Sequence, residues 1–105
     1  MIQQHAISRN GVPIRLTSER WQHIIEEHAE IASLHQEVLD TLREAERVLR
    51  GTDGELFAVR TMEPGKALVV VYREIDTDDG FVITAFVTRR LKSLERREQI
   101  WPPAA

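Results

Sequence analysis

The hydrophobic pattern of this chain changes its period near Gly54, and that change limits the folds the chain can adopt. Before Gly54, apolar residues recur at the three- and four-residue spacing of amphipathic helices. After Gly54, runs rich in Val, Ile, Phe, Tyr and Thr are separated by short turn sequences, which is typical of antiparallel strands. The order predicts an α+β fold in which two N-terminal helices pack on one face of an antiparallel meander sheet of about four strands.

Two helices are expected in the first half of the chain. A short extended segment at residues 12–16, which its proline confines to a sheet edge or a strand start, leads into the first helix. Thr17 or Ser18 is the expected N-cap of this helix, because a hydroxyl group can accept a hydrogen bond from the first turn. The second helix is predicted over residues 33–50, with Gly51 past its end as the C-cap.

Three strands are expected in the second half, at residues 55–62, 67–75 and 81–88. The connecting turns lie at residues 63–66 and 76–80. The second turn is rich in aspartate, but it lacks the full spacing and the closing bidentate glutamate of a calcium loop. The sequence therefore predicts a hairpin turn there and no metal site.

The composition fits one domain over residues 1–105. With 42% hydrophobic and 30% charged residues, a chain of 105 residues can build one compact core but not two. Cysteine is absent, which excludes a disulfide framework and a thiolate zinc site. Trp101 precedes two prolines that end regular structure, and we expect its ring to hold the tail against the body of the domain.

The sequence predicts a soluble, cytoplasmic protein without a membrane segment. No apolar run approaches the roughly 20 residues of a membrane span, and residues 1–5 lack the charged and apolar parts of a secretory signal. The formal net charge of −3 argues against broad, non-specific binding to nucleic acid, which depends on an excess of Lys and Arg. The charge is unevenly distributed, because residues 89–97 are basic and the helical half is acidic. A polyanion would therefore bind on the basic side only. The basic segment and the acidic helical half are each also compatible with a plain solvated face.

His28 is the most unusual residue of the first helix. At about 100° per residue, His28 falls on the apolar stripe of this helix and His23 points to nearly the opposite side. The other members of the stripe are Trp21, Ile24 and Ile25. A histidine in this position is either a neutral core residue with a hydrogen-bond partner, or a general acid or base at the end of a helix beside a cleft. The helix pattern alone leaves both interpretations open.

The turn lengths predict which strand residues share a face of the sheet. A four-residue loop at 63–66 pairs Arg60 with Val69 and so places Arg60 on the same face as Arg73. If the next loop has an even number of residues, Thr84 and Thr88 also lie on this face. The expected polar face contains Arg60, Arg73, Thr84 and Thr88. The expected apolar face, which should pack on the helices, contains Phe57, Val59, Leu68, Val70, Tyr72, Phe81, Ile83, Ala85 and Val87.

Two guanidinium groups and two hydroxyl groups on one open face suit a phosphate ligand, because arginine binds phosphate in bidentate geometry. Arginine and threonine are also common on any solvated sheet face, so a structural role stays open. A three-residue bulge turn at Gly80 would move Arg73 to the opposite set from Thr84. The grouping therefore depends on the register of the hairpin.

Three segments of the chain together resemble a known family. They are RWQHIIEEH at residues 20–28, LVVV at 68–71 and GFVITAFVT at 80–88. This combination resembles the small bacterial and phage domains of the barnase, EndoU, colicin E5/D and RelE group (the BECR fold). More narrowly, it is similar to the phage-associated nuclease-like branch of that group. The resemblance covers residues 14–101, nearly the whole chain.

The resemblance implies a fold of N-terminal helices packed on one side of a meandering sheet of about four strands. It also implies a metal-independent endoribonuclease without a cofactor, with RNA as the substrate. In that chemistry a base deprotonates a ribose 2′-OH, the 2′-oxygen attacks the neighbouring phosphorus, and an acid protonates the leaving 5′-oxygen. A toxin or a phage-defence component, with an antitoxin as partner, is the implied context.

The functional residues of the family carry over by position. His28 matches the second histidine of the helix motif and is implied as the acid or base. Arg73 is implied as a contact to the scissile phosphate, and Thr84 and Thr88 as hydrogen-bonding groups for phosphate or ribose. His23 is a second, weaker candidate that would contact the substrate. Arg60 joins the substrate-binding residues from the register argument alone.

The alternative is a catalytically inactive binding or regulatory module of the same fold, since a fold does not guarantee an activity. In that case we expect a protein partner on the acidic helical surface. A homodimer through an edge strand or the tail around Trp101 agrees with either interpretation.

Geometry separates the enzyme from the inactive module. An enzyme predicts that His28 lies within hydrogen-bond reach, direct or through one water, of Arg73 or a threonine beside an open groove, whereas a binding module predicts a fully enclosed ring and no groove. Because His28 belongs to the helical layer and Arg73 to the outer side of the sheet, this requires the helix to end at a sheet edge or over a strand end.

Overall fold

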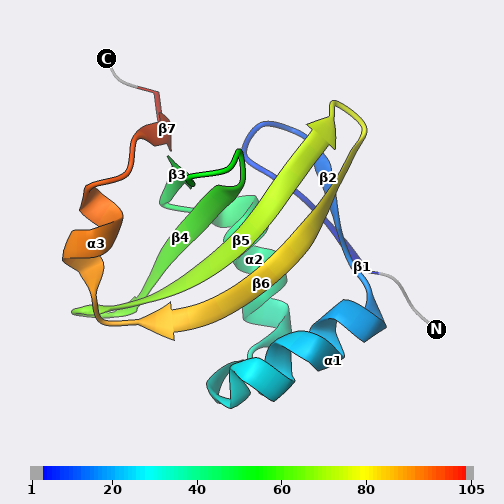
Figure 1. Ribbon diagram of the computed structural model, residues 1–105, viewed down its shortest axis with the longest axis horizontal. Helices are drawn as coiled ribbons and strands as arrows, with labels where there is room; N and C mark the ends of the chain where they lie inside the picture. The colour runs from blue at the N-terminus through cyan, green and yellow to red at the C-terminus, as the bar shows by residue number, and fades with distance from the viewer. Residues whose placement is uncertain (1–3, 104–105) are drawn as a thin grey trace.

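The computed structural model describes residues 4–103. Residues 1–3 and 104–105 of the predicted domain lie outside the described residues, and so does most of the segment 1–5 on which the prediction about a secretory signal rests. The strands form one seven-stranded sheet in the order β1-β2-β6-β5-β4-β3-β7 (Figure 1). They are β1 (Gln4–Ile7), β2 (Pro13–Leu16), β3 (Arg47–Arg50), β4 (Leu56–Glu63), β5 (Lys66–Asp76), β6 (Asp79–Thr88) and β7 (Gln99–Trp101). The helices are α1 (Ser18–Glu27), the short 3-10 helix η1 (Ala29–Ile31), α2 (His35–Glu44) and α3 (Leu91–Glu95).

The predicted α+β class is confirmed, with two helices packed on a sheet whose centre, β3 to β6, is an antiparallel meander. The predicted number of about four strands is wrong, because short strands near both ends of the described chain extend the sheet to seven. The sheet is also mixed, since β2 pairs with β6 in parallel. The strands β1 and β7 have four and three residues, too few for a recognisable alternation of apolar and polar side chains.

The second helix is shorter than predicted. It ends at Glu44 because Ala45 has an extended backbone (ψ 134°), and Arg47–Arg50 then forms strand β3 between β4 and β7. Val48 and Leu49 are buried on opposite faces of the sheet, and two adjacent apolar residues fit a helix or a doubly covered strand equally well. Gly51 is therefore not a helix cap but part of the β3–β4 hairpin, where its N–H donates to the carbonyl of Glu55 at 2.7 Å.

The first helix begins as predicted. The Thr17 hydroxyl accepts a hydrogen bond from the backbone N–H of Arg20 at 3.0 Å, which makes Thr17 the N-cap. The extended segment before it is β2, an inner strand that pairs with β1 on one side and with the start of β6 on the other. The helix stops at His28, which is its C-cap residue.

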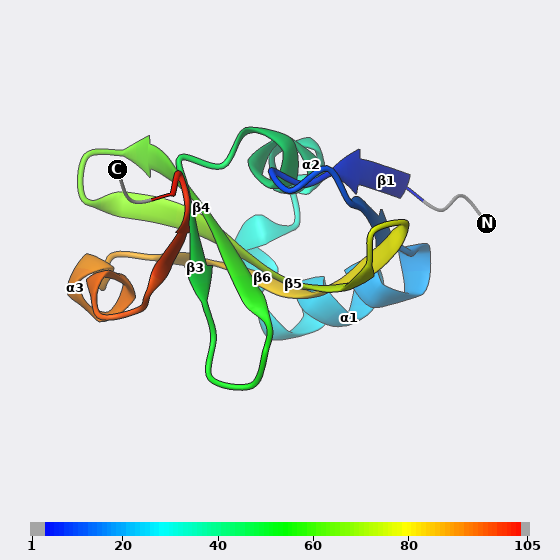
Figure 2. The ribbon, with the colours of Figure 1, turned by 90° about the horizontal axis from the view of Figure 1, so that it is seen from above.

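The two main helices occupy different places on the sheet. Helix α2 lies across one face, here called the helix face, and buries Val38 and Leu42 against it (Figures 1 and 2). On β6, strand β2 pairs with the first part only, at Gly80 and Phe81. Farther along β6, the helices α1 and η1 pack beside β6 (Figure 1). Helix α1 therefore lies beside the part of the β6 edge that β2 leaves uncovered.

The predicted register between β4 and β5 is wrong by one residue. Arg60 lies opposite Leu68 instead of Val69, because Met62 is an extra residue in β4: Glu63 still pairs with Lys66, but Thr61 already pairs with Ala67. A shift of one residue moves a side chain to the other face of a strand. Arg60 consequently lies on the helix face, whereas Phe57 and Val59 lie on the opposite face, here called the outer face.

A bulge in β6 changes the faces a second time. Val71 lies opposite Thr84 but Tyr72 lies opposite Val82, so Ile83 is an extra residue in β6. As a result, Phe81 and Ile83 also belong to the outer face, contrary to the prediction. The residues correctly assigned to the helix face are Leu68, Val70, Tyr72, Ala85 and Val87.

The outer face has a hydrophobic cluster of its own. Its fully buried members are Leu49, Val59, Ala67, Val69, Val71 and Leu94. Helix α3 covers one end of this cluster through Leu91 and Leu94, and the rest stays open between α1 and the β3–β4 hairpin (Figures 1 and 2). The centre of the outer face is therefore apolar, where the sequence predicted a polar surface.

Two smaller predictions are confirmed. Residues 76–80 form the plain hairpin between β5 and β6, closed by the pair Asp76 and Asp79. The ring of Trp101 packs under the guanidinium of Arg9, with 4.1 Å between the Arg9 Cζ and the ring centroid, and so holds the end of β7 against the domain. None of the helices within residues 4–103 has the length and apolar composition needed to cross a membrane.

Candidate nucleic-acid interface

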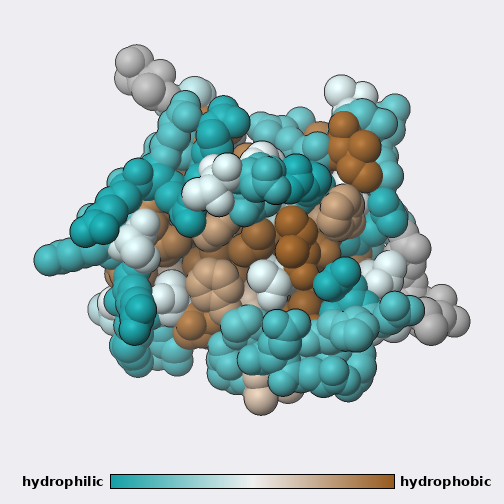
Figure 3. Space-filling model, viewed as in Figure 1, coloured by the Kyte–Doolittle hydropathy of each residue, from teal (hydrophilic) through white to brown (hydrophobic). Residues whose placement is uncertain are grey.

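The outer face forms a hollow with an apolar floor and a polar rim (Figure 3). The floor contains the partly exposed side chains of Phe57 on β4 and of Ile83 and Phe86 on β6, with buried side chains of β5 between them. Partly exposed aromatic rings next to charged groups can stack on unpaired bases. The outer face is therefore the part of the molecule where the candidate residues need to be located.

His28 reaches this face around the edge of β6. Its ring centroid lies 6.0 Å from that of Phe86, and its side chain is 33% exposed. Its Nδ1 lies 3.7 Å from Oε2 of Glu30, and its backbone N–H donates to the carbonyl of Ile24 at 2.8 Å. The helix thus ends at a sheet edge, which is the geometry that an active site built on His28 requires.

The two threonines lie on the same face as His28. Thr84 and Thr88 flank Phe86 at two positions on either side, roughly 7 Å along β6. The Thr88 hydroxyl accepts a hydrogen bond from the backbone N–H of Arg90 at 3.0 Å. Within residues 4–103 neither threonine is hydrogen-bonded to His28, so the three groups surround one aromatic ring without being linked directly.

Arg73 lies at the other end of the outer face. Its Nη2 donates to the backbone carbonyl of Asp53 at 2.9 Å and lies 3.9 Å from the Asp53 carboxylate. Val69 is the neighbour of Phe86 on β5, and the four positions from Val69 to Arg73 span roughly 13 Å. The structure therefore places Arg73 and His28 on one face but does not bring them into contact.

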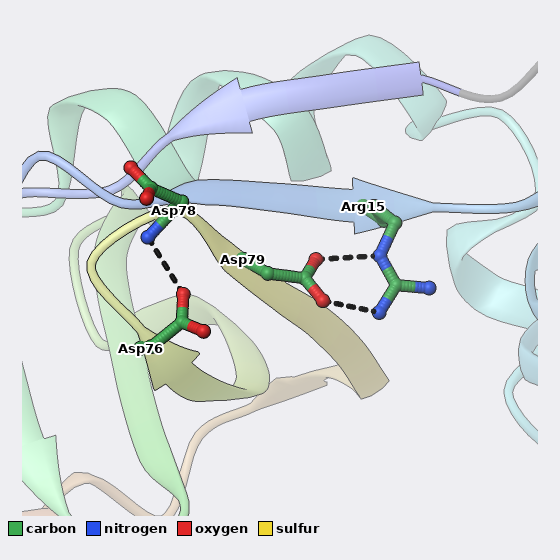
Figure 4. A network of polar contacts seen from close by, with 4 residues as sticks. All are labelled: Arg15, Asp76, Asp78 and Asp79. Atoms are coloured by element: carbon green, nitrogen blue, oxygen red, sulfur yellow. Dashed lines mark hydrogen bonds and ion pairs between the residues drawn. The ribbon is translucent and has the colours of Figure 1, made fainter.

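Two other guanidinium groups accompany Arg73 along the rim. The Arg97 Cζ lies 4.4 Å from the centroid of the Phe57 ring, a cation–π contact, and its Nη1 donates to the carbonyl of Arg50 at 3.4 Å. Arg15 lies directly opposite Phe81 on the outer face and forms a bidentate pair with Asp79 (Figure 4).

Two carboxylates near this face are held in their ionised form. The hydrogen bond from the Arg15 guanidinium lowers the pKa of Asp79. The backbone N–H of Asp53 and that of Glu55 itself lower the pKa of Glu55, and the charges of Arg73 and Arg97 contribute further. These carboxylates compensate part of the arginine charge and hold the side chains in place.

Arg60 and His23 lie outside the outer face. Arg60 lines a pocket of about 210 Å³ on the helix face, together with Glu37, Thr41, Thr61, Met62 and Leu68. His23 is exposed on α1, and its side chain makes no hydrogen bond, ion pair or ring contact with any residue that the structure describes. The structure thus separates these two from His28, Thr84, Thr88 and Arg73.

Among residues 4–103 there is no group of three or more His, Asp or Glu side chains that could hold a metal ion. Comparison of the chain with protein-family models, with curated proteins and with solved structures finds no match. The assignment of function therefore depends on the chemistry of the outer face itself.

Sequence reasoning missed the aromatic residues of the site. The predicted register, which is one residue off, places Phe57 and Phe81 on the helix face. Arg97 was noted only as part of the basic segment 89–97. Its position over Phe57 follows from the path of the chain after α3, for which the sequence has no local signal.

Proposed function

We propose that the protein is a metal-independent endoribonuclease that binds single-stranded RNA across the outer face of its sheet. The observation that supports this most directly is the position of His28, which is about one third exposed beside Phe86, on a face that also presents aromatic rings, hydroxyl groups and guanidinium groups. Aromatic rings accept unpaired bases, and guanidinium groups bind phosphates.

In the proposed reaction His28 transfers the proton. As a base it takes the proton of a ribose 2′-OH while the 2′-oxygen forms a bond to the neighbouring phosphorus. The bond from phosphorus to the 5′-oxygen breaks, the leaving 5′-oxygen takes a proton from solvent water, and a 2′,3′-cyclic phosphate is left. His28 then releases its proton to solvent. Thr84 and Thr88, on either side of Phe86, would donate hydrogen bonds to the phosphate or the ribose. Arg73 would hold the RNA backbone farther along the face.

The test compares the two histidines of α1. Purified protein is incubated with a mixed single-stranded RNA in EDTA, alongside His28→Ala and His23→Ala. We expect 2′,3′-cyclic ends from the unchanged protein and a loss of about a hundredfold or more in His28→Ala, the usual range for removing a general acid or base. His23 is exposed on the same helix, away from Phe86, so His23→Ala is the matched control. If only His28→Ala loses activity, the proton transfer is assigned to His28.

Two results would contradict the proposal. If neither the unchanged protein nor His28→Ala yields products at high enzyme concentration, the protein is not this nuclease. If EDTA abolishes cleavage, the reaction depends on a metal ion and the proposed chemistry is wrong.

The arrangement of Arg73 favours a second candidate, a module of the same fold that binds without cleaving. Its guanidinium is engaged by Asp53 and the polar neighbour of the His28 ring is Glu30, so no assembled pair of imidazole and guanidinium is in place. Such a module would bind RNA on the outer face, or a protein on the acidic helices. Binding of RNA that persists without cleavage would identify it.

A toxin or phage-defence role, with an antitoxin as partner, extends the first proposal. It predicts that production of the protein in a bacterial host slows growth and that His28→Ala at equal protein level does not. Equal toxicity of both proteins would show that the growth inhibition does not depend on the proposed cleavage.

A further inference from the structure

A pocket of about 190 Å³ opens on the outer face where β2 ends and α1 begins. Its lining residues are Arg15, Thr17, Arg20, Phe81 and Val82. Five positions of β6, roughly 15 Å, separate Phe81 from Phe86, so this pocket is distinct from the surroundings of His28. The pocket brings together two guanidinium groups, one hydroxyl group and one aromatic ring, and none of its lining residues is acidic.

Arg15 is already oriented for a ligand. Its Nε and Nη2 donate to the two carboxylate oxygens of Asp79 at 2.8 and 3.1 Å, which leaves Nη1 outside the pair (Figure 4). A bidentate pair fixes the plane of the guanidinium, so little conformational freedom is lost when Nη1 donates to a further oxygen atom.

Arg20 supplies the positive charge that Asp79 does not neutralise. Its backbone N–H is bound to Thr17, but its guanidinium forms no hydrogen bond or ion pair with any residue between 4 and 103. An exposed, uncompensated guanidinium at the mouth of a pocket attracts an anion.

Phe81 adds a flat apolar surface. It lies between Arg15 on β2 and Arg73 on β5 in one row across the sheet, and all three side chains point to the outer face. Its side chain is partly exposed beside the pocket that it lines. Aromatic side chains next to positive charges stack the bases of single-stranded nucleic acids.

We propose that this pocket is a nucleotide subsite, in which Arg15 and Arg20 bind a phosphate group and Phe81 stacks the attached base. The inference rests on the proposed function only in naming RNA as the source of that nucleotide. The subsite would hold a part of the strand at a distance from the bond that is cleaved near His28. The pocket beside Arg60 is a poorer phosphate site, because Glu37 lines it.

The test measures direct binding without any cleavage. Uridine 5′-monophosphate, uridine and inorganic phosphate are titrated into the protein and followed by backbone amide shifts. The variants are Arg20→Ala, Phe81→Leu and, as a matched control, Arg43→Ala, which removes an arginine paired with Asp40 on α2. Thermal unfolding shows which variants are folded, and if Phe81→Leu is not, the Arg20 comparison decides alone.

We expect the nucleotide to bind more tightly than phosphate or uridine, with shifts centred on Thr17 and Phe81. Arg20→Ala should weaken nucleotide binding roughly tenfold or more, the value of a hydrogen bond to a charged group, while Arg43→Ala should leave it unchanged. Phe81→Leu should weaken nucleotide binding but not phosphate binding.

Three outcomes would overturn the inference. Absence of saturable nucleotide binding at millimolar concentration removes the subsite, and an equal effect of Arg20→Ala and Arg43→Ala shows only general charge attraction. Phosphate binding as tight as that of the nucleotide removes the base-stacking role of Phe81. Nucleotide binding that persists in a protein without RNA cleavage would leave the subsite standing and refute the nuclease proposal instead.

Discussion

Tyr72 is the largest fully buried side chain of the core, and its hydroxyl group has no hydrogen-bond partner within residues 4–103. Burial raises the pKa of Tyr72, and the nearby charge of Glu74 raises it further, so the hydroxyl stays neutral. A buried polar group without a partner costs about 1 to 3 kcal/mol. The unpaired hydroxyl group of Tyr72 therefore destabilises the fold, while the ring of Tyr72 stabilises it by filling the core.

Tyr72→Phe should increase the free energy of unfolding by about 1 kcal/mol, because the ring is kept and the unpaired hydroxyl is removed. The measurement is chemical denaturation at neutral pH. Leu68→Ala, at another fully buried position, is the control and should lose about 2 to 5 kcal/mol. A loss of stability in Tyr72→Phe would mean that the hydroxyl has a partner in solution.

The pair of Arg15 and Asp79 makes stability depend on pH. Because the pKa of Asp79 is lower in the folded than in the unfolded chain, its carboxylate stabilises the fold above the unfolded pKa of about 4, and this contribution is lost as the pH falls through the folded pKa. Asp79→Asn should therefore be less stable than the unchanged protein at neutral pH, and the difference should shrink below about pH 4.

Denaturation curves recorded between neutral and acidic pH measure that difference. Asp78→Asn is the matched control, because Asp78 lies in the same turn and its carboxylate forms no ion pair with the described residues (Figure 4). A difference between Asp79→Asn and the unchanged protein that stays constant into the acidic range would contradict the assigned pair.

The elements of the fold differ in how strongly the sequence specifies them. Helix α1 has an N-cap, an apolar stripe and an acidic first turn, so its beginning follows from local rules. The long strands β4, β5 and β6 lie within two residues of their predicted limits, since each is bounded by a turn sequence. Strand β3 was taken for helix, because Val48 and Leu49 are buried by partners far away in the chain.

The candidate site was only partly accessible to the same reasoning. His28, Thr84 and Thr88 lie on one face because a helix end and the alternation of a single strand place them there. The prediction for Arg60 is wrong because the extra residue Met62 shifts the pairing of β4 by one residue and so reverses the face of every strand residue before it. The register depends on such bulges, which a hydrophobic pattern does not show.

The N-cap of α1 supports both the helix and the proposed subsite. Thr17→Ala should lower the free energy of unfolding by about 1 kcal/mol, because the backbone N–H of Arg20 loses its acceptor. Thr17→Ser keeps the acceptor and should retain most of the stability. Denaturation of the three proteins provides the comparison, and equal losses in both variants would show that the methyl group of Thr17, and not its hydroxyl group, stabilises the helix.

The charges of the domain are divided between its two sides. The net charge is −3, yet the outer face has Arg15, Arg20, Arg73 and Arg97 along its rim, and helix α2 on the other side contains the acidic residues Glu37, Asp40 and Glu44. A protein with this distribution repels polyanions in general and accepts them in one orientation. The overall charge is therefore no argument against RNA binding on the outer face.

This division predicts how RNA affinity responds to salt. Each phosphate contact to a single strand contributes about −0.7 to the slope of log affinity against log salt concentration. Arg97→Ala, on the outer face, should reduce the steepness of that slope by about 0.7, whereas Arg43→Ala, on α2, should leave it unchanged. Both variants lose one positive charge, so the comparison isolates position from net charge. Fluorescence anisotropy of a labelled single-stranded RNA, measured in the His28→Ala protein to prevent cleavage, gives the slopes. Equal slopes for the two arginine variants would show that RNA does not lie on the outer face.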